Sequence, residues 1–347
     1  RADAYLYCVE AQSPATGYWV PLAPSWVISE KFKVCGVLEP DHENKCYHIR
    51  IVTNADVATF KKAKEGTVKN GRLVCPETGS ETPIATIRGD RKVDGKTEYG
   101  LRQWENDDLV PRSEDTVQER LYCIRYIEIY YTAKKDFNSG IRSWKRGAQL
   151  DKEEAENLKE LNDFLNSKIL KKEFRRHYLE PNEEDLQREG KVIELLQERF
   201  MEWQKEGYIP SKKISSGAET DRLFRERGWT HWHHLFNPRQ LLVHGLFNKL
   251  VYLLKDHDQK VSGYLFVGKL ANWNSRITQW LSSQSGGACG GKQTFANIAL
   301  NTLYNYSCRQ IKTLESVQLP LPEPKEKFLN STVYTQDSLM NQCISDF

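Results

Sequence analysis

The sequence of 347 residues predicts an α+β fold in which a β-rich N-terminal part precedes mainly helical regions. Short apolar segments separated by Pro, Gly and Asn fill residues 1–132, which is typical of strands and turns. From residue 151 onward, apolar residues recur at helical spacing. We therefore divide the chain into a β-rich region 1–132, a charged helical hairpin with its linker 133–220, and a mainly helical region 221–347.

Composition limits the classes of protein to which the chain can belong. Hydrophobic residues make up 39% and charged residues 28%, as in ordinary soluble proteins. A net charge of +3 is too small to predict a nucleic-acid partner by itself, so such a site has to be local. No apolar run approaches the ~20 residues of a membrane span, so we expect no membrane partner. Eight scattered cysteines without a Cys-x-x-Cys pair favour reduced thiols in a cytoplasmic protein.

Two segments of the N-terminal region carry clear strand signals. Asn70-Gly71, flanked by Val68 and Leu73, predicts a tight β-hairpin. The segment 117–131 is rich in β-branched and aromatic residues and alternates in polarity. We predict a strand from about Leu121, with a turn of helix as one option before it.

The charged region predicts a pair of helices that project from the body. Asp151 with Glu154 resembles a capping box, and Asn182 with Asp185 starts a second helix. Their apolar repeats suggest an antiparallel, coiled-coil-like hairpin. The basic residues between the helices form either a solvated tip or a contact to the DNA backbone. Together with two lysines of the linker Lys205–Thr220, the DNA-binding candidates are Lys171, Lys172, Arg175, Arg176, Lys212 and Lys213.

The C-terminal region predicts helices over 238–255, 260–281 and 294–315. In front of the first helix, three histidines and two tryptophans crowd before Asn237-Pro238. Asn is a favoured N-cap and Pro fits the first helical position, so the helix begins at Pro238. Its free N–H groups form a site suited to an anion, and we expect Arg239 to extend outward to a carboxylate or phosphate. The alternative is a capped core helix covered by an aromatic loop.

Two similar turns, Ser13–Gly17 and Cys75–Gly79, have the outline of zinc-ribbon knuckles. A working knuckle needs two thiolates in one tight turn, and two knuckles complete a tetrahedral site. Here the four ligand positions hold Ser13, Thr16, Cys75 and Thr78. Because one thiolate cannot hold zinc, we expect no metal there. We also expect none at the adjacent histidines, His231, His233 and His234, whose side chains should diverge.

Catalytic motifs are missing from the sequence. Gly286–Lys292 matches the core of a phosphate-binding loop, but Gln293 replaces the required Ser or Thr and no buried strand precedes it. The sequence lacks the Asp-Pro-Pro-Tyr tetrapeptide that amino-methylating enzymes use. It also lacks a strand-linked Gly-rich loop of the kind that binds S-adenosylmethionine. We therefore assign no catalytic residue.

Taken together, these segments resemble the central part of the large adenine-specific DNA methylases that contain a zinc ribbon, a group found beside bacterial anti-phage genes. The resemblance runs nearly end to end and includes rare, Trp-rich strings. The segments that carry it are Val20–Trp26, Gly71–Pro76, Glu119–Arg125, Gly207–Ser211, Gly228–Leu242, Ala271–Arg276 and Ala299–Tyr306.

The resemblance has three implications. The residues Phe236, Asn237, Pro238 and Arg239 are similar to the Phe-Thr-Pro-Arg motif that lies against the methionine end of S-adenosylmethionine. The N-terminal region would be a degenerate ribbon that keeps the fold without zinc. The helical region would lead into a truncated methyltransferase α/β core that contains neither the Gly-rich loop nor Asp-Pro-Pro-Tyr.

We therefore expect a fragment or subunit of an S-adenosylmethionine-dependent DNA adenine-N6 methyltransferase, related to restriction or anti-phage defence. Its partners would be DNA and the remainder of the methyltransferase, and the isolated chain would be inactive. The alternative is a non-enzymatic DNA-binding or assembly subunit that pairs with a separate catalytic chain. Sequencing the flanking DNA would separate the two readings.

Overall fold

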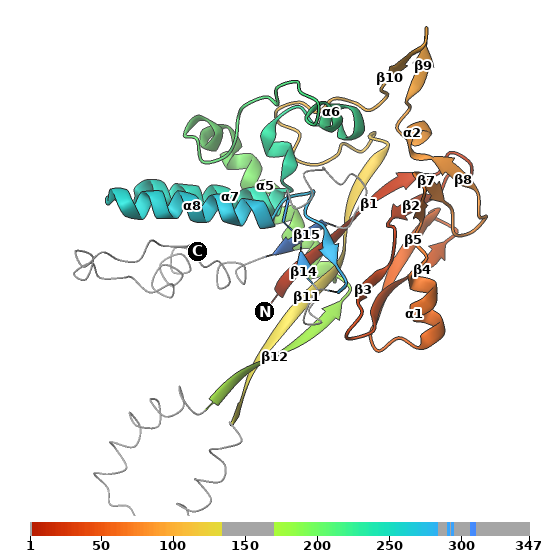
Figure 1. Ribbon diagram of the computed structural model, residues 1–347, viewed down its shortest axis with the longest axis horizontal. Helices are drawn as coiled ribbons and strands as arrows, with labels where there is room; N and C mark the ends of the chain where they lie inside the picture. Colours follow the sequence, from red (N-terminus) through yellow and green to blue (C-terminus); the bar gives the residue numbers. More distant parts are fainter. Residues whose placement is uncertain (1, 134–169, 284–289, 292, 295–305, 310–347) are drawn as a thin grey trace, which may run out of the picture.

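The computed structural model describes residues 2–133, 170–283, 290–291, 293–294 and 306–309 (Figure 1). At its centre is an antiparallel sheet with the strand order β12-β11-β1-β15, and β2 also pairs with β1. Its strands are β1 (Ala2–Gln12), β2 (Trp19–Leu22), β11 (Val117–Ala133), β12 (Leu170–Leu179) and β15 (Tyr306–Arg309). All of these pairings are antiparallel.

The strand β1 is buried along most of its length because both faces of the sheet are covered. Its side chains alternate between two hydrophobic clusters. Leu6 and Cys8 join the cluster around Trp26, whereas Tyr7 joins the other cluster. A strand buried on both faces forms a continuous apolar run and lacks the polar alternation of a half-exposed strand.

Small sheets pack beside the central sheet. One contains β3 (Val27–Ser29), β4 (Val34–Asp41) and β5 (Cys46–Val52), followed by the helix α1 (Val57–Ala63). Another contains β6 (Val68–Lys69), β7 (Arg72–Val74) and β8 (Glu81–Pro83), followed by α2 (Ile84–Ile87) and the hairpin of β9 (Arg91–Val93) and β10 (Lys96–Glu98). The predicted hairpin at Asn70-Gly71 is confirmed: both residues have positive φ, 50° and 71°, which Asn and Gly tolerate.

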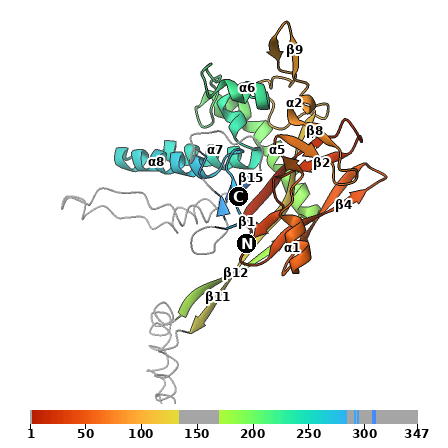
Figure 2. The same cartoon turned by 45° about the vertical axis from the view of Figure 1, so that its right-hand side comes forward.

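The described helices of the C-terminal half lie on one side of the central sheet (Figure 2). They are α5 (Glu183–Lys205), α6 (Asp221–Arg227), the short 3₁₀ helix η1 (Trp232–Leu235), α7 (Pro238–Leu253) and α8 (His257–Trp273). The helix α7 packs against both α5 and α8. This arrangement brings the start of α7 close to the sheet and to the loop that follows β10.

The predicted helical hairpin needs correction. The second helix begins as predicted, with Asn182 as its N-cap and Asp185 completing the capping box. However, Leu196, Phe200 and Trp203 are buried in a cluster with residues of α7, so the apolar repeat of α5 faces the core of the protein. The first helix, expected from Asp151, lies outside the described residues.

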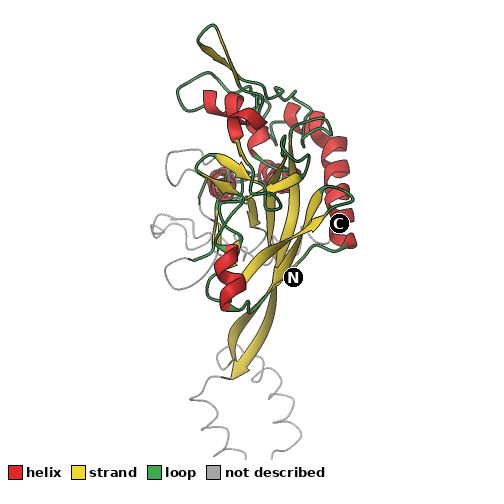
Figure 3. Cartoon of the chain, turned by 90° about the vertical axis from the view of Figure 1, so that its right-hand side faces the viewer, coloured by secondary structure: helices red, strands yellow, loops and turns green. Residues whose placement is uncertain are grey.

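The basic cluster does not form a tip between two helices, because Leu170–Leu179 is the strand β12. It pairs with β11, and Tyr178 is buried between the exposed side chains of His177 and Leu179, the alternation of a strand. β11 begins at Val117 without a preceding helical turn. Figure 3 shows the two strands continuing together beyond the small sheets as a long ribbon.

Three boundaries in the C-terminal half also differ from the predictions. The helix expected over 260–281 ends at Trp273, where the side chain of Asn274 donates to the Leu270 carbonyl (3.2 Å) and competes with the helix. The strand β13 (Trp280–Leu281) follows and pairs with β14 (Gly290–Gly291). Residues 306–309, expected in a helix over 294–315, form β15 because β1 offers a free edge there. The rest of that predicted helix, apart from residue 294, lies outside the described residues.

At the coarse level the α+β prediction is confirmed, since the structure combines antiparallel sheets with helices. The predicted linker Lys205–Thr220 is partly core: Tyr208, Ile209 and Ile214 are buried. In the described part of the chain, every helix is too short or too polar to cross a bilayer.

Candidate functional site

The start of α7 has the capping geometry that the sequence predicts. The Oδ1 atom of Asn237 accepts from the Gln240 N–H at 2.8 Å, and the Gln240 side chain accepts from the Asn237 N–H at 3.0 Å. Pro238 occupies the first position of the helix. Two of the backbone donors at this end are therefore satisfied within the capping box.

Arg239 lies inside the protein, so the expectation that it extends outward is wrong. Its guanidinium binds the carboxylate of Glu189 on α5 and lies over the ring of Tyr5, 4.1 Å from the centroid. The hydroxyl of Tyr7 donates to the same carboxylate at 2.7 Å. Arg239 thus ties α7 to α5 and β1, because a buried charge needs a paired and hydrogen-bonded partner.

The three histidines before α7 form a compact group, contrary to the divergent side chains that we expected. The His233 and His234 ring centroids are 4.3 Å apart, and each lies 5.4 Å from the His231 ring. The Nδ1 atom of His234 accepts from the N–H groups of Thr230 (3.1 Å) and His231 (3.2 Å), and its Nε2 donates to the Glu105 carbonyl (3.0 Å). Burial lowers the pKa of His234 to about 2.

Two further imidazoles are buried and neutral. His233 is 1% exposed and packs against the Phe200 ring, and burial lowers its pKa to about 4. Burial also lowers the pKa of His244 to about 4, and its Nε2 donates to the Asn274 carbonyl at 3.1 Å. Within the described ranges, no group of three or more His, Cys, Asp or Glu side chains could hold a metal ion.

Arg276 is the residue that joins these segments. Its side chain is 1% exposed and donates to the Glu119 carboxylate at 2.8 Å. Its other N–H groups donate to main-chain carbonyls, and the guanidinium also lies over the Trp104 ring, 5.1 Å from the centroid. The carbonyl acceptors, each at 2.8 Å, are those of His234, Phe236 and Leu109. Arg276 therefore fixes the chain just before α7 to β11 and to the loop before it.

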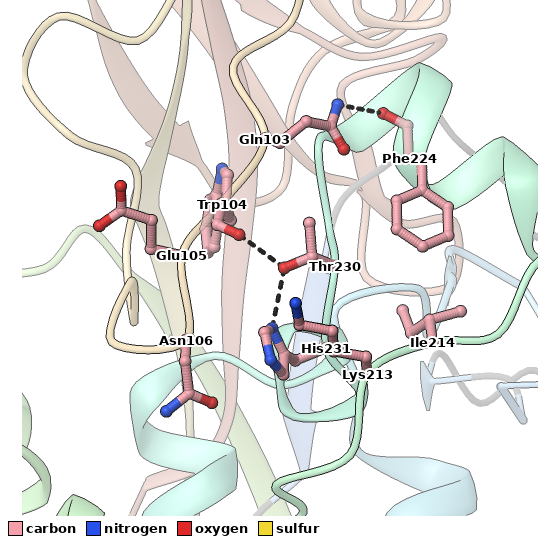
Figure 4. Close-up of a pocket in the computed structure, with 9 residues that line it drawn as sticks. All are labelled: Gln103, Trp104, Glu105, Asn106, Lys213, Ile214, Phe224, Thr230 and His231. Atoms are coloured by element: carbon pink, nitrogen blue, oxygen red, sulfur yellow. Dashed lines mark hydrogen bonds between the residues drawn. The ribbon is translucent and has the colours of Figure 1, made fainter.

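A cavity of about 490 Å³ opens beside this junction (Figure 4). Ile214 and Phe224 lie on one side of it, and Glu105 and Asn106 lie on the opposite side. The hydroxyl of Thr230 is 2.5 Å from the Trp104 carbonyl and 2.8 Å from the His231 Nδ1 atom. The complete lining consists of Gln103, Trp104, Glu105, Asn106, Lys213, Ile214, Phe224, Thr230 and His231.

The two predicted turns, Ser13–Gly17 and Cys75–Gly79, have the same backbone geometry and lie together. In each, the terminal Gly has positive φ, and its N–H donates to the carbonyl of the first residue, at 2.7 and 2.8 Å. The Thr16 hydroxyl lies 3.7 Å from the Cys75 Sγ atom, so the turns face each other. Cys75 also contacts the Tyr47 hydroxyl at 3.6 Å. We call this arrangement the paired turns.

The ligand positions of the paired turns contain one thiol and three hydroxyl groups. Ser13 is fully buried, and its hydroxyl has no hydrogen-bond partner among the described residues. Hydroxyl groups are poor zinc ligands, since zinc sites in proteins use Cys, His and carboxylates. The residues present therefore do not fit a zinc ion.

The predicted DNA-binding residues lie in two separate parts of the fold. Four are on β12, where Arg175 is exposed and its Nη1 atom lies 3.5 Å from Glu128. Lys212 and Lys213 are exposed in the segment before α6, and Lys213 lines the cavity. Figure 1 shows β12 extending away from α6, so the structure does not bring the two groups together.

Sequence reasoning missed the central position of Arg276 and the contribution of the loop 102–115. Arg276 is the last residue of Ala271–Arg276, one of the segments that carry the resemblance. No sequence pattern predicts that a single Arg after a helix is buried. In the loop, Arg102 pairs with Asp108 and Asp115, both almost buried. The two Arg and three Asp residues within this loop were the sequence feature that could have indicated the ion pairs. No family model, curated protein or solved structure matches this chain.

Proposed function

We propose that the chain is the DNA-binding part of an S-adenosylmethionine-dependent DNA adenine-N6 methyltransferase with a role in restriction or anti-phage defence. In such an enzyme a methyl group passes from the cofactor to the exocyclic amine of an adenine flipped out of the duplex. The proposal places the catalytic motifs outside this chain. The isolated chain should therefore bind DNA without methylating it.

The observation that carries the proposal is the paired turns. The resemblance implies a ribbon in which two knuckles, far apart in the sequence, face each other. Contact between Thr16 and Cys75 across 59 residues agrees with that arrangement. We propose that the region is a degenerate zinc ribbon, in which hydrogen bonds among Thr16, Cys75 and Tyr47 replace the metal.

Restoring the ligands tests the degenerate ribbon. The variant Ser13→Cys/Thr16→Cys/Thr78→Cys would place four thiols at the ligand positions, and we expect it to bind zinc stoichiometrically. The matched control, Thr78→Cys alone, provides only two thiols and should not. Elemental analysis of the purified proteins measures this. Stoichiometric zinc in the unmodified chain, or none in the triple variant, would contradict the degenerate ribbon.

The ribbon of β11 and β12 supports the DNA-binding part of the proposal. Two antiparallel strands fit the major groove of B-DNA. The strand β12 carries four of the predicted basic residues in a segment of six, and among the described strands it is the outermost of the central sheet on its side. Arginines on such an edge can reach phosphate groups, which supply most of the affinity of nucleic-acid-binding proteins.

Fluorescence anisotropy with a labelled DNA duplex over a salt series tests this proposal. We expect the variant Arg175→Gln/Arg176→Gln to bind more weakly and to reduce the slope of log K against log salt by about 1–2, since each phosphate contact contributes about 0.9. Lys96→Gln on the β9–β10 hairpin is the matched control. Equal affinity and slope in both variants would count against β12 as the DNA contact.

Cofactor binding by Phe236, Asn237, Pro238 and Arg239 belongs to the complete enzyme in this proposal. In the described arrangement these residues do not fit the carboxylate of S-adenosylmethionine, because Arg239 is bonded to Glu189 and Asn237 to Gln240. The helical region would lead into the methyltransferase core, whose remaining segments lie outside the described residues. Glu189 would have to release Arg239 for it to contact the cofactor.

The internal pairing of Arg239 favours a second candidate, a non-enzymatic DNA-binding or assembly subunit. In that case, the residues at the start of α7 would never contact cofactor. Methyl transfer from labelled S-adenosylmethionine to DNA, measured with the isolated chain and after adding a catalytic partner, separates the candidates. Turnover by the isolated chain would contradict both. Loss of reconstituted activity in Arg239→Lys at unchanged complex formation would favour the methyltransferase.

A further inference from the structure

Five exposed lysines gather on two neighbouring elements of the N-terminal region. Two lie in the turn between β3 and β4, and three lie at the C-terminal end of α1, which packs against β4. None of the five ammonium groups forms an ion pair with a described residue. We call this group the lysine patch, and its members are Lys31, Lys33, Lys61, Lys62 and Lys64.

The ring of Phe60 keeps two of these lysines close together. The Nζ atom of Lys33 lies 4.6 Å from the ring centroid, and that of Lys64 lies 5.9 Å from it. An aromatic ring attracts a cation, so it offsets part of the repulsion between the two ammonium groups. Lys33 also has a φ of 49°, a conformation that Asn or Gly adopts at lower cost. The turn itself therefore does not account for a lysine at this position.

The carboxylates of the same segments leave the patch positively charged. Segments 30–33 and 56–69 contain six lysines and three carboxylates, a surplus equal to the net charge of +3 of the whole chain. Asp56 caps the opposite end of α1, and Glu65 lies 3.7 Å from a lysine outside the patch. Glu30 is then the one carboxylate of these segments left to compensate five lysines. The patch is therefore a local site for an anionic partner.

The patch lies near the base of β12. The pairing of Cys35 with Val52 brings the start of β4 beside the end of β5. There the N–H of Ile51 donates to the carboxylate of Glu180, the residue after β12, at 2.7 Å. Arg175 is roughly 17 Å from Glu180 along an extended strand. Figures 1 and 3 show α1 and the β11–β12 ribbon on the same, lower side of the molecule. One turn of B-DNA, about 34 Å long, can therefore reach both basic groups.

We propose that the lysine patch is a second contact to the phosphate backbone of the duplex that β12 binds. This inference rests on the proposed function, because it adds a surface for the same DNA partner. Lysine is a point charge without the planar fork of arginine, so the patch suits phosphates of any sequence and does not read bases. The lysines would also attract an acidic protein, but the evenly spaced phosphates of a duplex extend over both basic groups.

Fluorescence anisotropy with a labelled duplex over a salt series tests the proposal. We expect Lys33→Gln/Lys64→Gln to bind about tenfold more weakly at about 0.1 M salt and to lower the slope of log K against log salt by about 1–2, because each phosphate contact contributes about 0.9. The matched control, Lys92→Gln/Lys96→Gln, removes the same charge from the exposed β9–β10 hairpin and should change neither quantity. Equal effects in the two double variants, or no effect of the first, would overturn the proposal.

A second variant separates a DNA contact from a role of Lys33 in the fold. Lys33→Asn removes the ammonium group, and Asn tolerates the positive φ of this turn better than Lys does. We therefore expect a midpoint of thermal unfolding at or above that of the unmodified protein, together with weaker duplex binding. A lower midpoint with unchanged duplex binding would make Lys33 a structural residue and overturn its assignment.

Lysine acetylation followed by mass spectrometry gives a readout that does not depend on variants. A duplex should protect Lys33 and Lys64 from acetylation and leave Lys92 and Lys96 unprotected. Equal protection by poly-glutamate and by the duplex would assign the patch to an acidic protein and overturn the proposal.

Comparison with the β12 variant Arg175→Gln/Arg176→Gln distinguishes a failure of this inference from a failure of the proposed function. If only the β12 variant lowers the salt slope, the patch is refuted and the proposed function stands. If only Lys33→Gln/Lys64→Gln lowers it, the patch stands and the β12 contact is refuted. If the unmodified chain does not bind the duplex, both are refuted.

Discussion

The start of α7 and the cavity beside it differ in how their polar groups are satisfied. At the start of α7, Asn237 and Arg239 are both buried and have protein partners. In the cavity, Lys213 is exposed and forms no ion pair with a described residue. Residues whose polar groups are saturated hold the fold together, and groups left open at a cavity wall can bind a ligand. This junction therefore has a structural half, at the start of α7, and a half with accessible polar groups, at the cavity.

The largest effect should come from Arg276, which supports both halves. Replacement by Met keeps the length of the side chain but leaves Glu119 and three carbonyls without their donor. We expect a loss of about 3–5 kcal/mol in the free energy of unfolding, the range for breaking a buried ion pair. Urea unfolding followed by circular dichroism measures it.

The matched control is Arg91→Gln, which removes an exposed pair with Glu98. It should cost no more than about 1 kcal/mol, as surface ion pairs do. Equal losses in the two variants would contradict the central position assigned to Arg276.

A smaller effect is expected for the pair of Arg239 and Glu189. Glu189 is partly exposed, so Arg239→Met should cost about 2–3 kcal/mol, somewhat less than for a fully buried pair. Urea unfolding measures this loss. Stability equal to that of the unmodified protein would contradict the structural role assigned to the Arg239–Glu189 pair.

Stability should also depend on pH through the buried imidazoles. The folded-state pKa values of His233 and His244, about 4, and of His234, about 2, lie below the ordinary value of 6.5. The unfolded chain therefore binds more protons below pH 6.5, and stability should fall as the pH drops from about 6.5 toward 4, by at most about 1.4 kcal/mol per pH unit for each histidine. Unfolding at a series of pH values measures the slope. His244→Gln should reduce it, and an unchanged slope would contradict burial of a neutral ring.

The smallest effect should follow from removing the cap of α7. Asn237→Ala leaves the Gln240 N–H without its acceptor and should cost about 1 kcal/mol. Asn237→Asp keeps an acceptor at the same place and should restore most of the loss. Thermal unfolding of the two variants measures this. A cap variant as stable as the wild type would mean that the first turn of α7 is held by other contacts.

The sequence predicted well the features that depend on local chemistry. Asn237-Pro238, Asn182 with Asp185, and Asn70-Gly71 each specify a cap or turn through their own backbone preferences, and all three are present. The similarity of the two turns at Ser13 and Cys75 was also visible, because both depend on a glycine with positive φ.

The features that the sequence did not reveal depend on partners distant in the chain. The segment Leu170–Leu179 forms a strand because β11 lies beside it, and its basic residues alone gave no sign of that pairing. Arg239 was expected to face outward, since its carboxylate partner, Glu189, lies on another helix 50 residues away. The cavity combines residues from four separate segments, 103–106, 213–214, 224 and 230–231, and no local pattern connects them.

Hydrogen–deuterium exchange with and without a DNA duplex tests the central claim, DNA binding through the β11–β12 ribbon, most directly. Among the described strands, β12 is at the edge of the central sheet, so we expect its outward N–H groups to exchange in the free protein. We expect a duplex to slow exchange along Leu170–Leu179 and to leave exchange at the start of α7 unchanged. Saturating duplex with no protection of β12, or with protection confined to α7, would contradict it.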